Sequence, residues 1–502
     1  MARRSSIVTT AGITLDRSLA APLHRQLYDA LRDAILSRRF KAEVRLPSTR
    51  SLARELGVSR NTAMVAFDQL LAEGYLEGKT GSGTYVARAL PDDLLRARAQ
   101  KSKAAGPQRG RRLSERGRLI ASTRPSVMRD ESRTRAFQPG VPDIESFPFT
   151  MWARMIGRRW RKPQPRLLGY GHPAGYEPLR QSIADYLSTA RAASCDPSQV
   201  IIVSGAQQAI DLAARALLDP ADAVWIEDPC YQGARGVFAG ALARIIPVPV
   251  DDEGLSVAAG RRFCPDARLA YVTPSHQYPL GMMMSLARRL ELLAWAREAG
   301  AWIVEDDYDS EYRYAGRPLA SLQGLDTEGR VIYIGTFSRV LFPSLRLGYM
   351  VVPLDMVEAF TSARAFAAYH SPLVEQDVLA EFIAEGHFAR HIRRMRALYQ
   401  ERQQILIESV SQELAGLLEV KPSEAGMHLI GWLQDGIDDK AASRIAADHR
   451  IDAPPLSFYC MDEKLPGGLL LGYTGINERE IRAGARRLAD ALREASKAKI
   501  SD

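Results

Sequence analysis

Apolar residues near the start of the chain recur at the period of a helix. Leucine or isoleucine stands at every fourth position from Leu23 to Ile35, with charged residues between them. This spacing predicts one amphipathic helix. A second helix is expected to begin at a hydroxyl cap, Ser48 or Thr49, and to end near Gly57, because glycine readily adopts the positive φ of a helix exit.

A third predicted helix begins directly after Ser59, a suitable cap, and continues through the apolar positions of residues 63–71. Only a short turn containing Gly57 separates the second and third helices. This pair predicts a helix-turn-helix whose second helix faces the major groove of DNA. The first turn of that helix, Arg60-Asn61-Thr62, offers groups that suit base edges and phosphates.

A glycine-rich hairpin is predicted directly after this helix. Two short strand-like runs in residues 74–86 flank a turn that contains Gly81, Ser82 and Gly83. Because glycine lacks a Cβ, the turn can bring Lys79 and bare backbone N–H groups close to phosphates or the minor groove. The hairpin is therefore interpreted as the wing of a winged helix-turn-helix.

Beyond residue 136, short apolar runs alternate with helical stretches. Five runs are predicted to be strands: 200–204, 223–227, 269–273, 302–305 and 331–335. Continuous apolar strands between helices predict an α/β fold with a mostly parallel sheet that is covered on both faces. Polar residues follow these strands directly, at the sheet edge where such folds bind ligands.

Length and composition exclude several classes of protein. A chain of 502 residues is expected to form two or three hydrophobic cores. No apolar run approaches the about 18 residues of a membrane span, and the start resembles no signal peptide, so we expect a cytoplasmic protein. The four cysteines are widely spaced and no metal site is expected, since His387 and His391 lack a completing ligand motif.

The positive charge is concentrated at the front of the chain. The net charge of +8 divides into +14 for residues 1–135 and −6 for residues 136–502. A basic front end on an acidic body indicates that double-stranded DNA is a partner of the front end only. A solubilising basic tail is the alternative that charge alone leaves open.

The chain is therefore expected to have three parts. Residues 15–87 form the winged helix-turn-helix, and residues 136–502 form the large domain, with a smaller C-terminal α/β subdomain from about residue 385. Residues 88–135 are basic and lack apolar periodicity, which predicts a flexible linker. This linker either contacts the DNA backbone or is a solvated spacer.

The front of the chain resembles the winged helix-turn-helix of the GntR family of regulators. The matching pieces are Leu46-Pro47-Ser48-Thr49-Arg50, Leu52-Ala53, residues 56–62 and residues 81–86. This resemblance implies that Arg50, Arg60 and the wing glycines contact operator DNA.

The strand-end motifs resemble those of fold-type-I aminotransferases. They are residues 204–210, 227–231, 273–281, 305–312 and 335–349. Combined with the GntR-like front, they resemble the MocR/GabR-type regulators over nearly the whole chain. The resemblance implies a fold-type-I pyridoxal-phosphate-transferase-like domain, a homodimer and a site for pyridoxal 5'-phosphate.

The resemblance also assigns roles to individual residues. Asp306 would keep the pyridine nitrogen protonated, Tyr231 would stack on the ring, and Tyr308 and His276 would bond to the ring hydroxyl. Tyr170 would reach the phosphate of the partner subunit. The remaining residues would bind the phosphate, with the first three at a helix N-terminus: Gly205, Ala206, Gln207, Thr336, Ser338 and Arg346.

One position departs from the aminotransferase pattern. Where the family has the Schiff-base lysine after Gly-Thr-Phe-Ser, this chain has Arg339, and no lysine occurs from Pro163 to Val420. A guanidinium stays protonated up to a pH of about 12, so it cannot act as a nucleophile near neutral pH. We therefore expect no catalysis and a ligand that binds without a lysine bond. The chain has ten lysines against 57 arginines, so a general drift from lysine to arginine is one alternative explanation of Arg339. An engineered change from lysine to arginine would give the same local sequence.

A second departure concerns the substrate carboxylate. Aminotransferases usually place an arginine on a late strand, but residues 468–474 offer no cation, and Arg180 or Arg235 would have to serve instead. The leading hypothesis is a homodimeric transcriptional regulator in which a small-molecule effector changes the arrangement of two DNA readers. The alternatives are an aminotransferase with a DNA-binding appendage and a regulator whose large domain is only a dimerisation scaffold.

Overall fold

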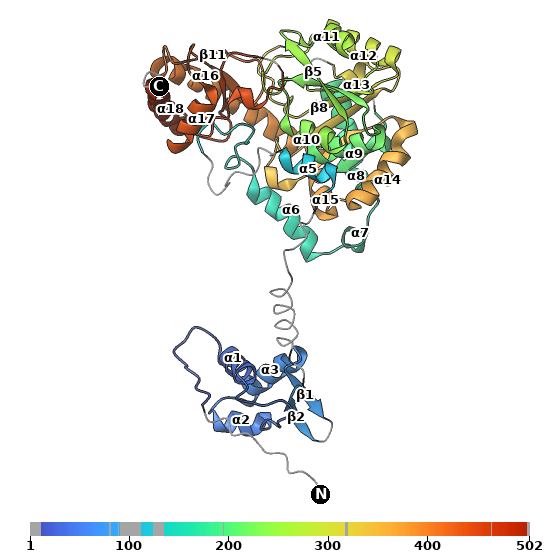
Figure 1. Ribbon diagram of the computed structural model, residues 1–502. Helices are drawn as coiled ribbons and strands as arrows, with labels where there is room; N and C mark the ends of the chain where they lie inside the picture. The colour runs from blue at the N-terminus through green and yellow to red at the C-terminus, as the bar shows by residue number, and fades with distance from the viewer. Residues whose placement is uncertain are drawn as a thin grey trace. The chain divides into compact units, whose positions relative to one another are not determined.

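The computed structural model describes residues 12–79, 82–88, 90, 112–123, 135–193, 195–316, 320–462 and 464–498. The chain divides into two compact units, Met1–Arg112 and Leu113–Asp502 (Figure 1). The predicted wing residue Gly81 and most of the predicted linker lie outside the described residues.

The first unit is a three-helix bundle with a two-stranded hairpin. Its elements are α1 (Leu23–Leu36), α2 (Thr49–Glu55), α3 (Arg60–Ala72), β1 (Leu76–Lys79) and β2 (Gly83–Val86), with the two strands antiparallel. Leu27, Leu31 and Leu70 are fully buried in its core. The order of helix, helix-turn-helix and hairpin is the one that the spacing of apolar residues predicts.

Serine caps fix where the two helices of the helix-turn-helix begin. Ser48 Oγ accepts a hydrogen bond from the backbone N–H of Ser51, and Ser59 Oγ accepts one from Thr62 at 3.0 Å. Each cap satisfies one of the free N–H groups of a first turn. Between the helices, Gly57 has a φ of +62°, as its predicted role in the turn requires.

Part of the predicted linker is a helix of the second unit. Helix α5 (Glu115–Ser122), capped by Ser114, lies against α10 (Gln232–Gly240) (Figure 1). A Cβ added at Gly240 would lie 3.1 Å from Ile120, so the missing side chain makes room for α5. This corrects the expectation of a linker without structure for these residues, and the second unit begins before residue 136.

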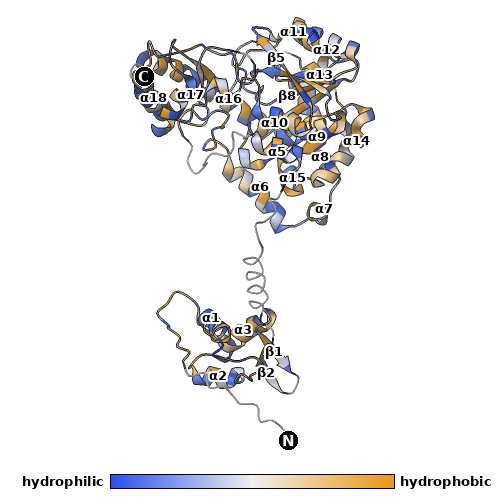
Figure 2. Ribbon diagram, viewed as in Figure 1, coloured by the Kyte–Doolittle hydropathy of each residue, from blue (hydrophilic) through white to orange (hydrophobic). Residues whose placement is uncertain are grey.

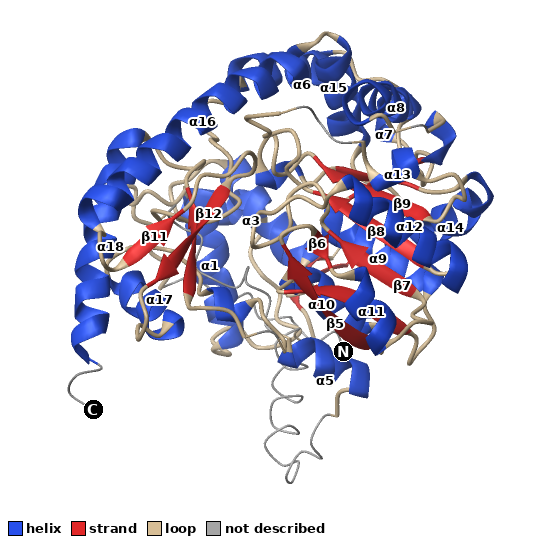
Figure 3. Ribbon diagram, turned by 90° about the horizontal axis from the view of Figure 1, so that it is seen from above, coloured by secondary structure: helices blue, strands red, loops and turns tan. Residues whose placement is uncertain are grey.

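The centre of the second unit is an eight-stranded sheet (Figure 3). In sheet order its strands are β3 (Val200–Val203), β10 (Gly348–Val351), β9 (Val331–Thr336), β8 (Trp302–Asp307), β7 (Leu269–Val272), β4 (Ala223–Asp228), β5 (Arg244–Asp251) and β6 (Gly254–Leu255). The pairings from β9 to β5 are parallel, and the remaining ones are antiparallel. All five predicted strands are present, whereas β5, β6 and β10 were not predicted.

Alternate residues of each strand enter cores on opposite faces of this sheet. On β4, Val224 and Ile226 pack with α9 and α10, while Trp225 packs with α11 and α12 on the other face, where it stacks on Trp295. Figure 2 shows hydrophobic residues, in orange, in the region of this sheet. Burial on both faces explains why the strands are continuous apolar runs.

Helices of the second unit cover the sheet, and further helices belong to the C-terminal part of the chain. Besides α5 and α10 they are α6 (Phe149–Arg161), α7 (Pro165–Leu168), α8 (Glu177–Arg191), α9 (Ala206–Leu217), α11 (Val257–Phe263), α12 (Leu286–Ala299), α13 (Leu322–Leu325), α14 (Val357–Ala368), α15 (Leu373–Ala384), α16 (His387–Glu413), α17 (Asp439–Asp448) and α18 (Glu478–Ala498). Short 3₁₀ helices are η1 (Pro197–Gln199), η2 (Pro343–Leu345), η3 (Leu354–Met356) and η4 (Leu456–Phe458).

A smaller antiparallel sheet lies in the C-terminal part. Its strands β11 (Leu418–Val420), β12 (His428–Leu433) and β13 (Gly468–Gly472) pack with α16, α17 and α18. The same core also contains Phe137 and Phe147, which precede α6. The segment before α6 therefore passes between the two sheets and reaches the edge of the site. None of the described helices is long and apolar enough to cross a membrane.

Candidate functional site

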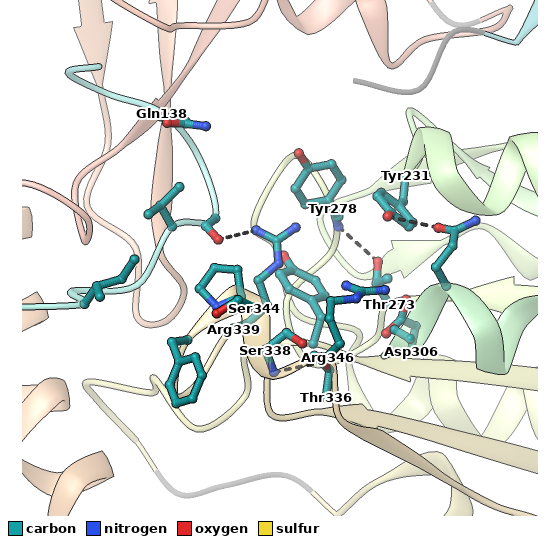
Figure 4. Close-up of a pocket in the computed structure, with 18 of the residues that line it drawn as sticks. Gln138, Tyr231, Thr273, Tyr278, Asp306, Thr336, Ser338, Arg339, Ser344 and Arg346 are labelled. Carbon is teal, nitrogen blue, oxygen red and sulfur yellow. Dashed lines mark hydrogen bonds between the residues drawn. The ribbon is translucent and has the colours of Figure 1, made fainter. Parts of the chain in front are cut away.

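The carboxyl ends of the parallel strands open onto a cavity of about 540 Å³ (Figure 4). Many of the residues predicted to bind a cofactor line this cavity: Ala206, Gln207, Tyr231, Asp306, Tyr308, Thr336, Ser338 and Arg346. Arg339, at the position of the Schiff-base lysine, lines it as well. They come from the ends of β4, β8 and β9, from the start of α9 and from the loop before β10. The opposite wall is the segment from Gln138 to Phe149.

Asp306, at the end of β8, has an unsatisfied oxygen at the floor of the cavity. Its Oδ2 accepts a hydrogen bond from the hydroxyl of Tyr271 at 2.7 Å, whereas its Oδ1 is buried without a partner among the described residues. Burial raises the pKa of this carboxyl to about 6, although the bond from Tyr271 opposes the shift. An acceptor of this kind suits an N–H donor on a ligand, since an unpaired buried acceptor is costly.

A second group of residues forms an anion seat at the start of α9. Gly205 precedes this helix with a φ of +86°, and a Cβ added there would lie 3.2 Å from the guanidinium of Arg346. Arg346 donates to the backbone oxygen of Ser204 at 2.8 Å. Ser338 Oγ is buried without a partner in the described structure. A helix N-terminus, a guanidinium and a free hydroxyl together suit a phosphate.

Tyr231 lies between the helix α9 and the cavity. Its hydroxyl donates to Gln207 Oε1 at 3.1 Å, and Gln207 donates in turn to the backbone of Gly233 at 2.9 Å. Burial raises the pKa of the Tyr231 phenol, so the hydroxyl remains protonated near neutral pH. The neutral ring is held beside the cavity, in a place where it can cover a flat ligand.

Arg339 extends across the cavity to the opposite wall. Its Nη1 donates to the backbone oxygen of Gly140 at 2.7 Å (Figure 4). A Cβ at Gly140 would lie 1.2 Å from this nitrogen, so glycine is required for the approach. The Arg339 charge opposes the burial-driven rise in pKa of Tyr231 and Tyr278, as expected for a cation close to both phenols.

Three of the predicted cofactor residues do not line the cavity: Gly205, which precedes α9 beside Arg346, His276 and Tyr170. His276 is buried behind Tyr308, with its Nδ1 2.8 Å from the tyrosine hydroxyl and 3.1 Å from Asp309. It positions Tyr308 and does not face the cavity. Tyr170 is 91% exposed and packs edge-on against Tyr369 on the surface of the unit.

Other residues of the cavity were missed by sequence reasoning. Tyr271 was counted only as a residue of a predicted strand, whereas Thr273 and Tyr278 belong to the predicted strand-end motif 273–281 without having been named as site residues. Thr273 donates to the buried Glu227 at 2.6 Å and accepts from the backbone of Tyr278 at 3.0 Å. Gln138 and Gly140 come from a segment with no strand or helix pattern, and only the glycine was a possible signal.

The proposed substitutes for a carboxylate-binding arginine lie elsewhere. Arg180 donates to the backbone oxygens of Pro197 and Val200, at 3.1 and 2.9 Å, and neither it nor Arg235 lines the cavity. On β13, Leu470 is fully buried with Tyr278 and Tyr459 in an apolar cluster. Strand β13, which has no cationic residue, therefore contributes apolar packing and no partner for a carboxylate.

In the first unit, the residues predicted to contact DNA lie on the helix-turn-helix and on the hairpin. Arg50, Arg60 and Asn61 are exposed, whereas the hydroxyls of Ser59 and Thr62 bond to each other at 2.8 Å. Ser59 thus acts first as a cap. On the hairpin, Lys79, Ser82 and Gly83 are exposed.

The hairpin also brings in a basic residue that was not predicted. Arg45, which precedes the helix-turn-helix, pairs with Tyr85 of β2 through an isolated bridge. Its guanidinium lies 2.8 Å from the position that a Cβ on Gly83 would occupy. Glycine at 83 thus lets Arg45 add its charge to the side of the hairpin.

Two family profiles match the chain, and they divide it as the structure does. Residues 23–86 match the family described as bacterial regulatory proteins, gntR family, and residues 146–488 match aminotransferase class I and II. The first match ends with β2, and the second covers the main sheet, the cavity and most of the C-terminal part.

Individual relatives match over almost their whole length. A probable rhizopine catabolism regulatory protein, MocR, of Rhizobium meliloti is 44% identical over 96% of both chains. A pyridoxine biosynthesis transcriptional regulator, PdxR, of Corynebacterium glutamicum is 31% identical over 89% of this chain and 91% of its own.

Solved aminotransferase structures match the second unit. The α-aminoadipate aminotransferase LysN of Thermus thermophilus, solved with N-(5'-phosphopyridoxyl)-L-leucine, is 28% identical with a TM-score of 0.67. The match covers 79% of this chain and 99% of the LysN chain. The fold of the second unit is therefore that of fold-type-I aminotransferases.

Proposed function

The chain belongs to the MocR-type regulators of the GntR family, which join a gntR helix-turn-helix to an aminotransferase-like domain, and from this premise we propose how it works. It is a transcriptional regulator that binds operator DNA as a homodimer, in the cytoplasm. An anionic effector in the cavity of the second unit changes the arrangement of the two DNA readers. The proposal that the cavity binds an effector rests on Asp306 Oδ1, which has no hydrogen-bond partner among the described residues and lies in the same cavity as the anion seat at the start of α9.

The residues present fit pyridoxal 5'-phosphate. The start of α9, Arg346 and Ser338 would hold the phosphate, and Tyr231 would cover the ring. Asp306 Oδ1 would accept a hydrogen bond from the protonated ring nitrogen. When bound, the cofactor supplies an electron-withdrawing ring and an aldehyde. The relatives solved with phosphopyridoxyl ligands support this choice of ligand.

We propose that the second unit does not catalyse transamination. Position 339 is where the aminotransferase pattern has its lysine, and the guanidinium there cannot act as a nucleophile or relay a proton near neutral pH. Binding would then depend on non-covalent contacts, among them the phosphate seat and Asp306. The names of the relatives, which are regulators, are consistent with sensing in place of catalysis.

Exposed aromatic residues support the homodimer. Tyr170 and Phe366 are 91% and 93% exposed, and Tyr369 is exposed beside Tyr170. Large apolar side chains that gather on a surface favour a protein partner. A second copy would cover this face and would bring Tyr170 to the cavity of its partner, as the resemblance implies.

A regulator with an unused scaffold domain is the second candidate. It predicts a cavity whose polar groups are satisfied within the protein. The unpaired oxygens of Asp306 and Ser338 favour the ligand-binding alternative, because buried polar groups without partners are rare.

Spectroscopy of the purified protein with pyridoxal phosphate tests these alternatives. We expect saturable binding, no absorption band that borohydride removes, and no exchange of amino groups between amino and keto acids. Arg339→Lys should create the covalent bond in the same cavity. Exchange catalysed by the unchanged protein would overturn the proposed lack of catalysis, and absence of binding up to millimolar concentration would favour the scaffold.

A further inference from the structure

We infer that the effector carries a carboxylate that pairs with Arg339, in addition to the acidic group held beside Arg346 at the start of α9. This inference deepens the proposed function and rests on it. It concerns the charge of the ligand, which determines which small molecules the regulator can sense.

The first observation is that neither arginine of the cavity has a carboxylate partner. Among the described residues, no Asp or Glu oxygen lies within 4.0 Å of the guanidinium nitrogens of Arg339 or Arg346. Each instead donates to one backbone oxygen, that of Gly140 or Ser204. Elsewhere in this unit, Arg191 pairs with Asp307 at 3.1 Å and Arg402 with Asp143 at 2.7 Å.

The second observation is that Asp306 forms no ion pair with these arginines. Its Oδ2 accepts the hydrogen bond from Tyr271, and its Oδ1 has no partner among the described residues. When a ring N–H binds at Oδ1, the carboxylate is matched by that cation. The positive charges of Arg339 and Arg346 are then left for acidic groups of the ligand.

The two guanidiniums are held by different segments of the cavity lining. Arg346 lies beside Gly205 at the start of α9, where it completes the phosphate seat. Arg339 lies beside Gly140, on the wall formed by the segment before α6. A ligand with one acidic group could neutralise only one of them.

Arg339 also has donors to spare. A guanidinium has five N–H groups, and the described contacts use one of them, on Gly140. The remaining face can form the paired hydrogen bonds that a carboxylate prefers. The side chain is half-buried in a cavity with the apolar neighbours Val141 and Phe149, which strengthens such a bond relative to open solvent.

No other cation in the described lining can take this role. Arg339 and Arg346 are the basic residues among those that line the cavity, and β13 contributes Leu470 to the neighbouring apolar cluster. Arg339 therefore places a cation where the aminotransferase pattern has the lysine that bonds to the ring aldehyde. A ligand group facing it is favoured if acidic and disfavoured if it is an ammonium.

Two sources of carboxylate share this chemistry. The acid can be part of the ring, as in 4-pyridoxic acid 5'-phosphate, or it can belong to an amino or keto acid that binds beside pyridoxal phosphate. Both place a carboxylate against Arg339 while the phosphate stays at Arg346.

Calorimetric titration of the full-length protein with three phosphates tests the inference. Pyridoxal phosphate, pyridoxamine phosphate and 4-pyridoxic acid 5'-phosphate differ only in an aldehyde, an ammonium or a carboxylate on the ring. We expect the acid to bind at least about tenfold more tightly than the amine, the effect of one charge-assisted pair. In Arg339→Gln this ratio should fall to within about twofold, and Arg339→Lys should restore part of it.

Arg346→Gln is the matched control, because it should weaken all three ligands alike. A second arm adds alanine or succinate to protein loaded with pyridoxal phosphate. Tight binding of the free acid that Arg339→Gln abolishes would also support the inference and would assign the carboxylate to a separate molecule. The thermal midpoint of each variant shows that it is folded.

Two results would overturn the inference. The first is equal affinity for the acid and the amine in the unchanged protein, with no binding of a free acid. The second is an acid preference that persists in Arg339→Gln. Either result leaves the proposed function intact. Failure of all three phosphates to bind at millimolar concentration would instead contradict the proposed function.

Discussion

The DNA-binding surface of the first unit and the cavity of the second unit present their side chains in different ways. Arg50, Arg60 and Asn61 are exposed on two consecutive helices, within the short segment 50–61. The cavity is assembled from segments between Gln138 and Arg346, and several of its side chains are buried. Local sequence therefore determines the first site, whereas the second depends on the whole fold.

The comparison shows why charge behaves differently in the two sites. Exposed arginines keep their ordinary charge and attract phosphates through a field that salt screens. In the cavity, burial raises the pKa of Asp306 to about 6. Burial also raises to about 7 the pKa of Glu227, which lies behind the lining residue Thr273 and accepts its hydrogen bond. The cavity can thus change its charge with pH or with a ligand, which the DNA-binding surface does not do in the same range.

The largest expected effect tests whether the two units unfold independently. Trp225 and Trp295 are fully buried and stacked with ring centroids 3.8 Å apart. Trp295→Ala should lower the free energy of unfolding of the second unit by about 3–5 kcal/mol and leave the first unchanged.

Tryptophan fluorescence measures this effect, because all six tryptophans lie in the second unit. Circular dichroism follows both units. Trp160→Ala is the control, since this side chain is 60% exposed. If the first unit loses stability in step with the second, the units are not independent.

The next effect concerns Asp306 and pH. The pKa of its carboxyl rises from 3.8 to about 6 on folding, chiefly through burial. The protonated form is therefore favoured by folding, and its contribution is present below pH 3.8 and is lost as pH rises through about 6. Asp306→Asn should raise the stability of the ligand-free second unit by up to about 3 kcal/mol at pH 8.

Chemical unfolding at a series of pH values measures this gain, which should disappear towards pH 4. The exposed Asp252→Asn is the control. The Asp306 variant should also bind pyridoxal phosphate more weakly. A gain that does not depend on pH would show that repacking, and not the charge, is responsible.

Some features of the fold and of the site could be predicted from sequence because they depend on neighbouring residues. The caps Ser48 and Ser59, the turn at Gly57 and the five buried strands are of this kind. The strand-end motifs also predicted that Asp306, Ser338 and Arg346 lie close together, and all three line one cavity.

Other features depend on contacts that the local pattern does not contain. Strand β5 holds Pro247 and Pro249, residues that argue against a strand, and it is tolerated because it pairs with β6 only at its end. Helix α5 is too polar to stand out and is held by contact with α10. Gly140 gains its role only when folding brings it to Arg339.

A smaller effect is expected from the DNA-binding surface. Arg60→Ala should weaken binding to operator DNA by roughly 10- to 100-fold, the effect of losing one arginine contact to a base. Fluorescence anisotropy with a DNA fragment defined by footprinting measures it, and Arg297→Ala in α12 is the control. Unchanged affinity would remove Arg60 from the recognition surface.

The smallest effect separates the cap from DNA contact. Ser59→Ala removes the hydrogen bond to the N–H of Thr62 and should destabilise the start of α3 by about 1 kcal/mol. Hydrogen exchange of the amides of α3 in the full chain measures this loss. Ser59→Asp should restore protection, because aspartate also caps helices, and failure to do so would contradict the role of Ser59 as a cap.

Helix α10 connects the lining of the cavity to helix α5. Tyr231, which would cover a bound ring, directly precedes its first turn, and α5 rests on Gly236 and Gly240 near its other end. A helix of this length behaves as a stiff rod of about 14 Å. This rod joins the residue that would cover a bound ring to α5, the first described helix of the second unit.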